Sequence, residues 1–284
     1  MALTAPSNTH PSGAAMSQCA RVNGSCKRCE GDLPFEFTMA FQPIVDLSLA
    51  QIVTYEALVR GPCGESAWSV ISQVTDELLY RFDQACRVKA IEMASALDMQ
   101  TDLSINFLPN AVYEPEACIQ ATLAVSKRVG WPTHRLIFEI TETERVRDRQ
   151  HLCNIINAYR SMGFKTALDD FGNGYANLDL LTDLTPDKLK IDRELVMNCD
   201  KDLRRQALLN AIILLAQELD MTLIAEGVET RAEALWLARA GIVQQQGFYF
   251  AKPSINSLGQ DITPLLAGLK SEAHDKLGAM DARY

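Results

Sequence analysis

The feature that most constrains the fold is a series of eight apolar, β-branched runs that alternate with helical segments from Phe37 onward. Such alternation is typical of parallel strands joined by right-handed helical crossovers. The clearest helical face consists of Leu208, Ile212, Leu215 and Leu219, whose spacing places all four on one side. The predicted strands cover residues 37–45, 52–59, 103–107, 136–140, 164–168, 188–191, 222–225 and 243–250.

The first two predicted strands break this alternation, because only residues 46–51 separate them. A parallel crossover needs roughly a dozen residues or more, so these two strands are expected to pair as an antiparallel hairpin. The sequence therefore predicts an α/β fold, a TIM-like (β/α)8 barrel with an antiparallel first strand. A doubly wound open sheet is the alternative, but no glycine-rich phosphate-binding loop follows any early strand.

The length of the chain, 284 residues, suits one barrel domain of about 250 residues with short tails. We expect a mobile N-terminal segment with a cysteine cluster at residues 1–34, the barrel at 35–256 and a peripheral C-terminal tail at 257–284. The start lacks the features of a secretion signal, and no stretch approaches the roughly 20 apolar residues of a membrane span. We therefore expect a cytoplasmic protein without membrane contact.

The net charge of −9 argues against a nucleic acid polymer as a partner, because such binding needs clustered Lys and Arg. A small anionic substrate is compatible with this charge if metal ions offset the repulsion. Cys19, Cys26 and Cys29 form a candidate structural Zn²⁺ site, with His10 or another group as the fourth ligand. The alternative is a flexible tail whose thiols share no role.

Polar residues stand at the ends of successive predicted strands. The C-terminal ends of barrel strands meet at one mouth, so these residues are expected to face a common volume. Carboxylates gathered there would repel one another unless cations neutralised them, and hard oxygen ligands suit Mg²⁺ or Mn²⁺. Two such ions about 3.5 to 4 Å apart are a common device for phosphodiester cleavage. The residues are Glu56, Asn106, Glu139, Asp169, Asp170, Lys190, Glu226 and Gln246.

Each of these residues alone also fits an ordinary structural role. Asp170 and Glu226 would pass as turn residues, and Lys190 could pair with a nearby aspartate. Their joint placement at strand ends favours a metal site instead, in which Asp169 could bridge two ions and Lys190 would supply a further cation. The pattern predicts a metal-dependent phosphodiesterase.

A set of short motifs runs in order through residues 37–254. The motifs are Phe41-Gln42-Pro43-Ile44, Tyr55-Glu56-Ala57-Leu58-Val59-Arg60, Ser104-Ile105-Asn106, Phe138-Glu139-Ile140-Thr141-Glu142, Asp169-Asp170-Phe171-Gly172, Lys188-Leu189-Lys190-Ile191-Asp192, Ala225-Glu226-Gly227-Val228-Glu229 and Gln246-Gly247-Phe248-Tyr249-Phe250-Ala251-Lys252-Pro253. Together they resemble the EAL domain family, whose members hydrolyse the bacterial second messenger cyclic di-GMP. The likeness is greatest to the branch found in blue-light-regulated members. It implies the same barrel and hydrolysis of cyclic di-GMP to linear pGpG by a two-metal mechanism.

The resemblance also implies a role for each site residue. The ligands of two Mg²⁺ or Mn²⁺ ions would be Glu56, Asn106, Glu139, Asp169, Asp170 and Glu226. The catalytic set would be Glu56, Glu226, Lys190, which orients or polarises the attacking water, and Gln246, which supports a water at the metal. The substrate would contact Arg60 through a phosphate, and also Leu58, Gln42 and Pro253. Glu142 and Glu229 would anchor the loop that carries Gly172 to Tyr175.

Two segments depart from the family pattern without removing a metal ligand. Gly-Pro-Cys-Gly-Glu-Ser follows Arg60 in place of a Trp-containing run, and Gly241-Ile242-Val243 replaces the usual Gly-Cys-Asp. One alternative function is a non-catalytic cyclic di-GMP receptor, which the complete ligand set disfavours. Another is an unrelated barrel enzyme in which Lys190 transfers a proton beside a metal-stabilised enolate. The resemblance further implies a homodimer, and a regulatory protein partner is a further possibility.

Overall fold

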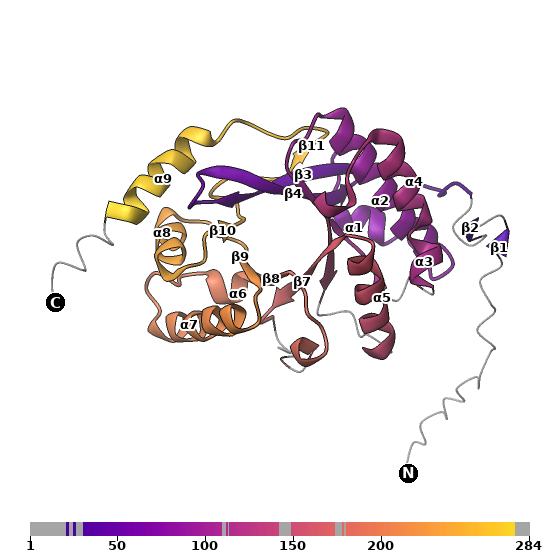
Figure 1. Cartoon of the computed structure of the whole chain (residues 1–284). Helices are drawn as coiled ribbons and strands as arrows, with labels where there is room; N and C mark the ends of the chain where they lie inside the picture. The colour runs from indigo at the N-terminus through magenta and orange to yellow at the C-terminus, as the bar shows by residue number, and fades with distance from the viewer. Residues whose placement is uncertain are drawn as a thin grey trace, which may run out of the picture.

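The computed structural model describes residues 21–22, 25–26, 31–109, 112, 114–141, 149–173, 178 and 180–275. In this part of the chain, eight strands close into a barrel that helices surround (Figure 1). The strands are β3 (Thr38–Asp46), β4 (Gln51–Arg60), β5 (Asp102–Asn106), β6 (Leu136–Thr141), β7 (Lys165–Phe171), β8 (Lys188–Ile191), β9 (Thr222–Ala225) and β10 (Gln244–Gln245). A separate short hairpin consists of β1 (Arg21–Val22) and β2 (Ser25–Cys26).

The strands follow one another around the barrel in chain order, and β10 closes it by pairing with β3. Strand β3 runs antiparallel to both β4 and β10, whereas successive strands from β4 to β10 are parallel. The turn after β3 is tight: Asp46 Oδ1 accepts hydrogen bonds from the backbone N–H groups of Ser48 and Leu49, and Ala50 has φ +56°. The prediction of a TIM-like barrel with an antiparallel first strand is confirmed.

The last strand is shorter than the sequence predicts, since β10 covers two residues of the expected 243–250. The chain leaves the sheet because Gly247 packs directly on the loop after β9, where a Cβ at Gly247 would lie 2.1 Å from the backbone oxygen of Val228. Val228 N donates to Gln246 O, and Tyr249 N donates to Val228 O, each at 3.0 Å. After this segment, β11 (Ser254–Ile255) pairs antiparallel with β3.

The apolar core lies between the outward-facing strand residues and the helices. On β8, Leu189 and Ile191 face this core, while the alternating Lys188 and Lys190 are buried on the other side of the strand. The helices are α1 (Ala67–Ile71), α2 (Leu79–Ala96), α3 (Pro115–Cys118), α4 (Gln120–Val129), α5 (Arg149–Ser161), α6 (Arg193–Val196), α7 (Leu203–Glu218), α8 (Arg231–Ala240) and α9 (Thr263–Asp275), with 3-10 turns at Thr133–Arg135 and Leu180–Thr182.

Helix α7 packs on the barrel with only part of the predicted face, since Ile212 and Leu215 are half-buried against the core. Leu209 and Ala216 are buried, whereas Leu208 is 54% exposed and Leu219 is 44% exposed. The spacing of apolar residues identified a real apolar face, but α7 carries leucine and isoleucine on more than one side. Periodicity alone therefore could not show which side packs inward.

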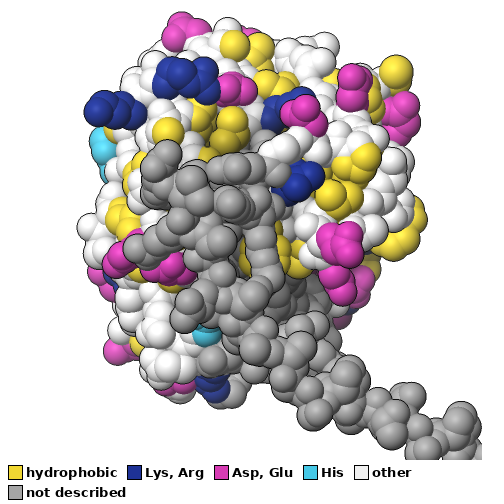
Figure 2. Space-filling model, turned by 90° about the vertical axis from the view of Figure 1, so that its right-hand side faces the viewer, with side chains coloured by type: hydrophobic (Ala, Val, Ile, Leu, Met, Phe, Trp, Pro, Cys, Tyr) yellow, Lys and Arg dark blue, Asp and Glu magenta, His cyan; other side chains and the backbone are white. Residues whose placement is uncertain are grey.

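Helix α9 contributes buried Leu266 and Leu269 to the core cluster shared with α7 and α8. None of the helices described by the structure is both long and apolar enough to cross a bilayer. On the visible face in Figure 2, basic and acidic side chains are interspersed and form no continuous basic stripe.

Candidate active site

Carboxylates predicted at strand ends come together inside the barrel. Glu56 on β4, Glu139 on β6 and Asp169 on β7 each offer an oxygen within 4.8 Å of the others. Asp169, Asp170 and Glu226 form a second group that meets the same limit. Asp169 belongs to both groups, which gives the cluster two adjacent oxygen-rich positions.

Two consecutive aspartates contribute because β7 is irregular at its end. Neighbouring residues of a regular strand point to opposite faces. The pairing of β7 with β8 shifts register between Leu168 and Phe171, and Asp170 takes φ +58°. Aspartate tolerates this left-handed conformation better than most residues. The resulting bulge brings Asp169 and Asp170 to the same cluster, where Asp170 N donates to Asp169 Oδ1 at 3.0 Å.

The ammonium group of Lys190 lies at the centre of the cluster. Its Nζ is 2.7 Å from both Glu139 Oε2 and Glu226 Oε1, 3.1 Å from Asp169 Oδ1 and 3.6 Å from Glu56 Oε2. Lys190 is 1% exposed, so solvent screens these contacts little. Asp170 is the fifth carboxylate of the cluster. If all five were ionised, they would leave four negative charges in excess of the one ammonium, and two divalent cations would balance these charges.

Burial and the neighbouring charges shift the pKa values of the cluster. Burial raises the pKa of Glu139 to about 8, although Lys190 opposes the shift. Burial and the neighbouring Asp169 raise the pKa of Asp170 to about 6, and burial also raises that of Glu226. Burial would lower the pKa of Lys190, but the surrounding carboxylates raise it well above its ordinary value. Cations entering the cluster would displace protons from its acids.

Two side-chain amides complete the cluster. Asn106 Nδ2 donates to Glu56 Oε1 at 2.9 Å, and Gln246 Nε2 donates to Glu56 Oε2 at 2.8 Å. The Oε1 atom of Gln246 is buried and has no hydrogen-bond partner within the described residues. A buried acceptor without a protein partner is available to a ligand such as a cation or water. The donor set, consisting of carboxylate and amide oxygens, fits Mg²⁺ or Mn²⁺.

Three structurally important residues had no role assigned from the sequence. The hydroxyl of Ser104, two residues before Asn106 on β5, donates to Glu139 Oε1. On α2, Asp83 pairs with fully buried Arg87 at 2.5 Å. Asp83 Oδ1 also accepts from the backbone N–H of Leu108 at 3.1 Å, which anchors the chain just after Asn106. The i, i+2 spacing of Ser104 and Asn106 was a usable signal, and so was the i, i+4 spacing of Asp83 and Arg87.

The predicted substrate residues lie at the rim. Arg60 and Leu58 are half-buried near the end of β4, and Arg60 Nη1 donates to Val59 O at 2.7 Å. Gln42 on β3 is buried and donates to Ala251 O at 3.2 Å. Pro253 directly precedes β11, whose pairing with β3 places it near Gln42.

Of the two predicted loop anchors, Glu229 is described, and it is not part of the carboxylate cluster. Glu229 is exposed and its Oε1 pairs with Arg193 Nη2 at 2.8 Å. Several residues with predicted roles lie outside the described residues, or have side chains that do: Glu142, Tyr175, His10, Cys19, Cys26 and Cys29.

Comparison with proteins of known sequence places this site in context. The chain is 35% identical over 221 residues to the "Blue light- and temperature-regulated antirepressor BluF" of Escherichia coli, a match over 77% of this chain and 55% of that protein. It is 29% identical over 235 residues to the "Probable cyclic di-GMP phosphodiesterase PdeN" of the same organism, covering 77% and 43% respectively. The chain therefore spans about half the length of these curated relatives.

Solved structures show the same architecture. The c-di-GMP-bound form of a standalone versatile EAL protein from Vibrio cholerae O395 has a TM-score of 0.79 and 49% identity, over 81% of this chain and 97% of that one. The manganese/cy-diGMP complex of Klebsiella pneumoniae BlrP1 at pH 9.0 has a TM-score of 0.72 and 34% identity, over 80% and 58%. The EAL domain model matches residues 33–253. The predicted resemblance is confirmed, and the chain belongs to the EAL domain family.

Proposed function

We propose that this chain is a cyclic di-GMP phosphodiesterase that forms linear pGpG with the help of two Mg²⁺ or Mn²⁺ ions. The observation that carries the proposal is that two clusters of three carboxylates each lie around Lys190 and have Asp169 in common. Relatives named as probable cyclic di-GMP phosphodiesterases, and EAL structures with cyclic di-GMP and manganese, support this choice of substrate and metal.

The chain offers a ligand set for each ion. Glu56, Asn106, Glu139 and Asp169 would hold one, and Asp169, Asp170 and Glu226 would hold the other. When bound, such ions activate water and stabilise the charge that develops on the phosphate and leaving oxygen. In the overall reaction the water oxygen bonds to phosphorus, one P–O bond to a ribose breaks, and the released oxygen takes a proton.

The remaining residues would bind and orient the reactants. Lys190 Nζ lies within hydrogen-bond distance of Glu139 and Glu226, and the carboxylates raise its pKa in the metal-free protein, so we assign it as a hydrogen-bond donor to the attacking water. Gln246 can hold that water through its unpaired Oε1. The Arg60 guanidinium can bind two oxygens of a phosphate, and Leu58, Gln42 and Pro253 would contact the rest of the nucleotide.

The direct test is hydrolysis of cyclic di-GMP by protein freed of metal with EDTA and then supplied with Mg²⁺ or Mn²⁺. We expect linear pGpG, identified by mass spectrometry, only with added metal, and inhibition by excess Ca²⁺. Glu56→Gln should lower the rate by about 100-fold or more, since it removes the negative charge of a proposed ligand. Glu92→Gln is the matched control, because this partly exposed glutamate pairs with Arg128 away from the site.

The same assay separates the alternatives. Tight cyclic di-GMP binding without cleavage under any metal would favour the non-catalytic receptor, and absence of binding would overturn both functions. A homodimer and a regulatory protein partner stay predictions, which sedimentation of the purified chain and co-purification would test. Structural Zn²⁺ at the three N-terminal cysteines also stays a prediction, and elemental analysis of reduced protein would measure it.

A further inference from the structure

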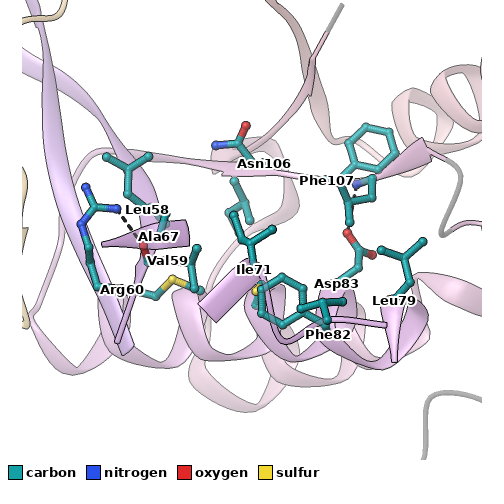
Figure 3. A pocket seen from close by; sticks show the side chains of 16 residues that line it. Leu58, Val59, Arg60, Ala67, Ile71, Leu79, Phe82, Asp83, Asn106 and Phe107 are labelled. Atoms are coloured by element: carbon teal, nitrogen blue, oxygen red, sulfur yellow. Dashed lines mark hydrogen bonds between the residues drawn. The ribbon is translucent and has the colours of Figure 1, made fainter. Parts of the chain in front are cut away.

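A cavity of about 370 Å³ lies beside the barrel mouth, between the strands and the first two helices (Figure 3). Residues of β3, β4 and β5 form one wall, and α1 and α2 form the other. None of the clustered carboxylates lines it, and it meets the proposed site only at one edge, through Asn106, Leu58 and Arg60. Its volume falls within the range of small-molecule sites, about 300 to 1,000 Å³.

The lining is apolar except for a few groups. Asp83 is already satisfied by Arg87 and by the N–H of Leu108, and the Asn106 amide donates to Glu56. The apolar part of the wall includes Met39, Ala57, Val59, Ile71, Val74, Leu79, Phe82, Ile105 and Phe107. A ligand here would therefore bury an apolar body.

Arg60 supplies the remaining charge. Within the described part of the chain no carboxylate forms an ion pair with Arg60, and Nη1 donates to the carbonyl of Val59. In Figure 3, Arg60 and Leu58 lie at one end of the cavity, whereas Leu79 and Asp83 lie at the other. The cavity thus has an apolar body and a cationic end.

The helix that covers the cavity is weakly held. Helix α1 has five residues, one buried side chain, Val70, and no side-chain cap at its N-terminus. Such segments open at low free-energy cost, which would admit a ligand. Residues 61–66, which depart from the family pattern, lead directly into α1. An empty apolar cavity lacks contacts on one side of its lining, so a ligand that fills it gains dispersion energy and apolar burial.

We propose that this cavity binds a small aromatic or aliphatic molecule with one acidic group, whose apolar part lies between β4 and α2 and whose acid binds Arg60. The cavity is too small for a protein segment, and Arg60, the only cationic side chain among its described lining residues, selects a monoanion. Such a ligand would compete with cyclic di-GMP, because Arg60 is also the proposed phosphate contact. This competition, unlike the binding itself, rests on the proposed function.

A pair of fluorescent probes tests the binding on the full chain. 8-Anilinonaphthalene-1-sulfonate carries the acid, and N-phenyl-1-naphthylamine has the same body without it. We expect Ala67→Phe and Val74→Phe, which fill the cavity from two positions, each to abolish saturable binding of both probes. Trp68→Ala is the matched control on α1, because Trp68 is 73% exposed and does not line the cavity. Circular dichroism would verify that each variant is folded.

Removing the charge tests the role of Arg60. Arg60→Gln should weaken binding of the sulfonate by roughly tenfold or more and that of the neutral probe by less than about twofold. Unchanged probe binding in both folded cavity-filling variants, or equal effects of Arg60→Gln on the two probes, would overturn the proposal.

Hydrolysis assays then test the competition. The sulfonate should raise the apparent KM for cyclic di-GMP without changing kcat, and should have no effect on Ala67→Phe. A fall in kcat at unchanged KM would refute competition at Arg60. If the protein hydrolyses no cyclic di-GMP, the proposed function fails, while the probe measurements still decide whether the cavity is a ligand site.

Discussion

Replacing Lys190 with methionine would remove the central ammonium and leave its carboxylates in place. At an effective dielectric of about 20, each 2.7 Å contact of Nζ is a gross attraction of about 6 kcal/mol, and the 3.1 and 3.6 Å contacts are each about 5 kcal/mol. Desolvation of the buried charges offsets most of this. Breaking a buried ion pair from one side typically costs about 3 to 5 kcal/mol, which is the loss we expect in the metal-free protein.

Urea unfolding in EDTA at pH 8, followed by circular dichroism, would measure this loss. Lys188→Met is the matched control, because Lys188 is also buried on β8 but forms no ion pair within the described residues. It donates one hydrogen bond to Gln244, so its replacement should lower the free energy of unfolding by about 1 kcal/mol or less.

The two variants should also differ in their response to metal. Mn²⁺ should stabilise Lys190→Met strongly, because divalent charge would replace the lost ammonium. A free energy of unfolding for Lys190→Met in EDTA that equals or exceeds that of Lys188→Met would refute the electrostatic account of the cluster.

Three further outcomes follow from the packing and the charges. The folded-state pKa of Glu139 is raised to about 8, so the stability gained by its protonation is complete below its ordinary pKa and is lost as pH rises towards 8. In the metal-free protein the free energy of unfolding should therefore fall over this range by up to about 1.4 kcal/mol per pH unit, and the urea midpoint should fall with it. A midpoint that rises would contradict this account. Gly247→Ala should lower the free energy of unfolding in urea by about 1 to 3 kcal/mol, because its Cβ would overlap the backbone of Val228. It should also weaken Mn²⁺ binding measured by calorimetry. Wild-type values of both quantities would show that the loop shifts freely. Asp83→Ala should lower the free energy of unfolding by about 3 to 5 kcal/mol, because it leaves Arg87 buried and without its ion-pair partner. Asp83→Leu combined with Arg87→Met should recover most of this loss. A double variant as unstable as the single one would exclude the unpaired charge as the cause.

The barrel and its reversed strand could be predicted because both depend on local information. The spacing between the first two strands permits only a hairpin, and the alternation of later strands with helices requires parallel neighbours. The placement of Glu56, Glu139 and Asp169 followed from the same topology, since the ends of parallel strands meet at one mouth.

Other features depend on contacts between distant segments and leave no local signal. The short β10 follows from the close approach of Gly247 to Val228, which no strand propensity encodes. The approach of both Asp169 and Asp170 to one cluster was predicted from their place at a strand end, but the register shift and the positive φ of Asp170 that produce it were not. The inward face of α7 was undetermined because apolar residues occur on more than one side.

Closure of the barrel by β3 and β10 joins parts of the chain that are synthesised far apart in time. Gln246 bonds to Glu56 across 190 residues, and Gln244 pairs with Asp46 in the same seam. Contacts of such high sequence separation form slowly, because the entropy of closing a long loop is lost before they stabilise the fold. A nascent chain that ends before β10 has neither the seam nor the amide that supports Glu56. We therefore expect assembly of the carboxylate cluster to be among the last events of folding.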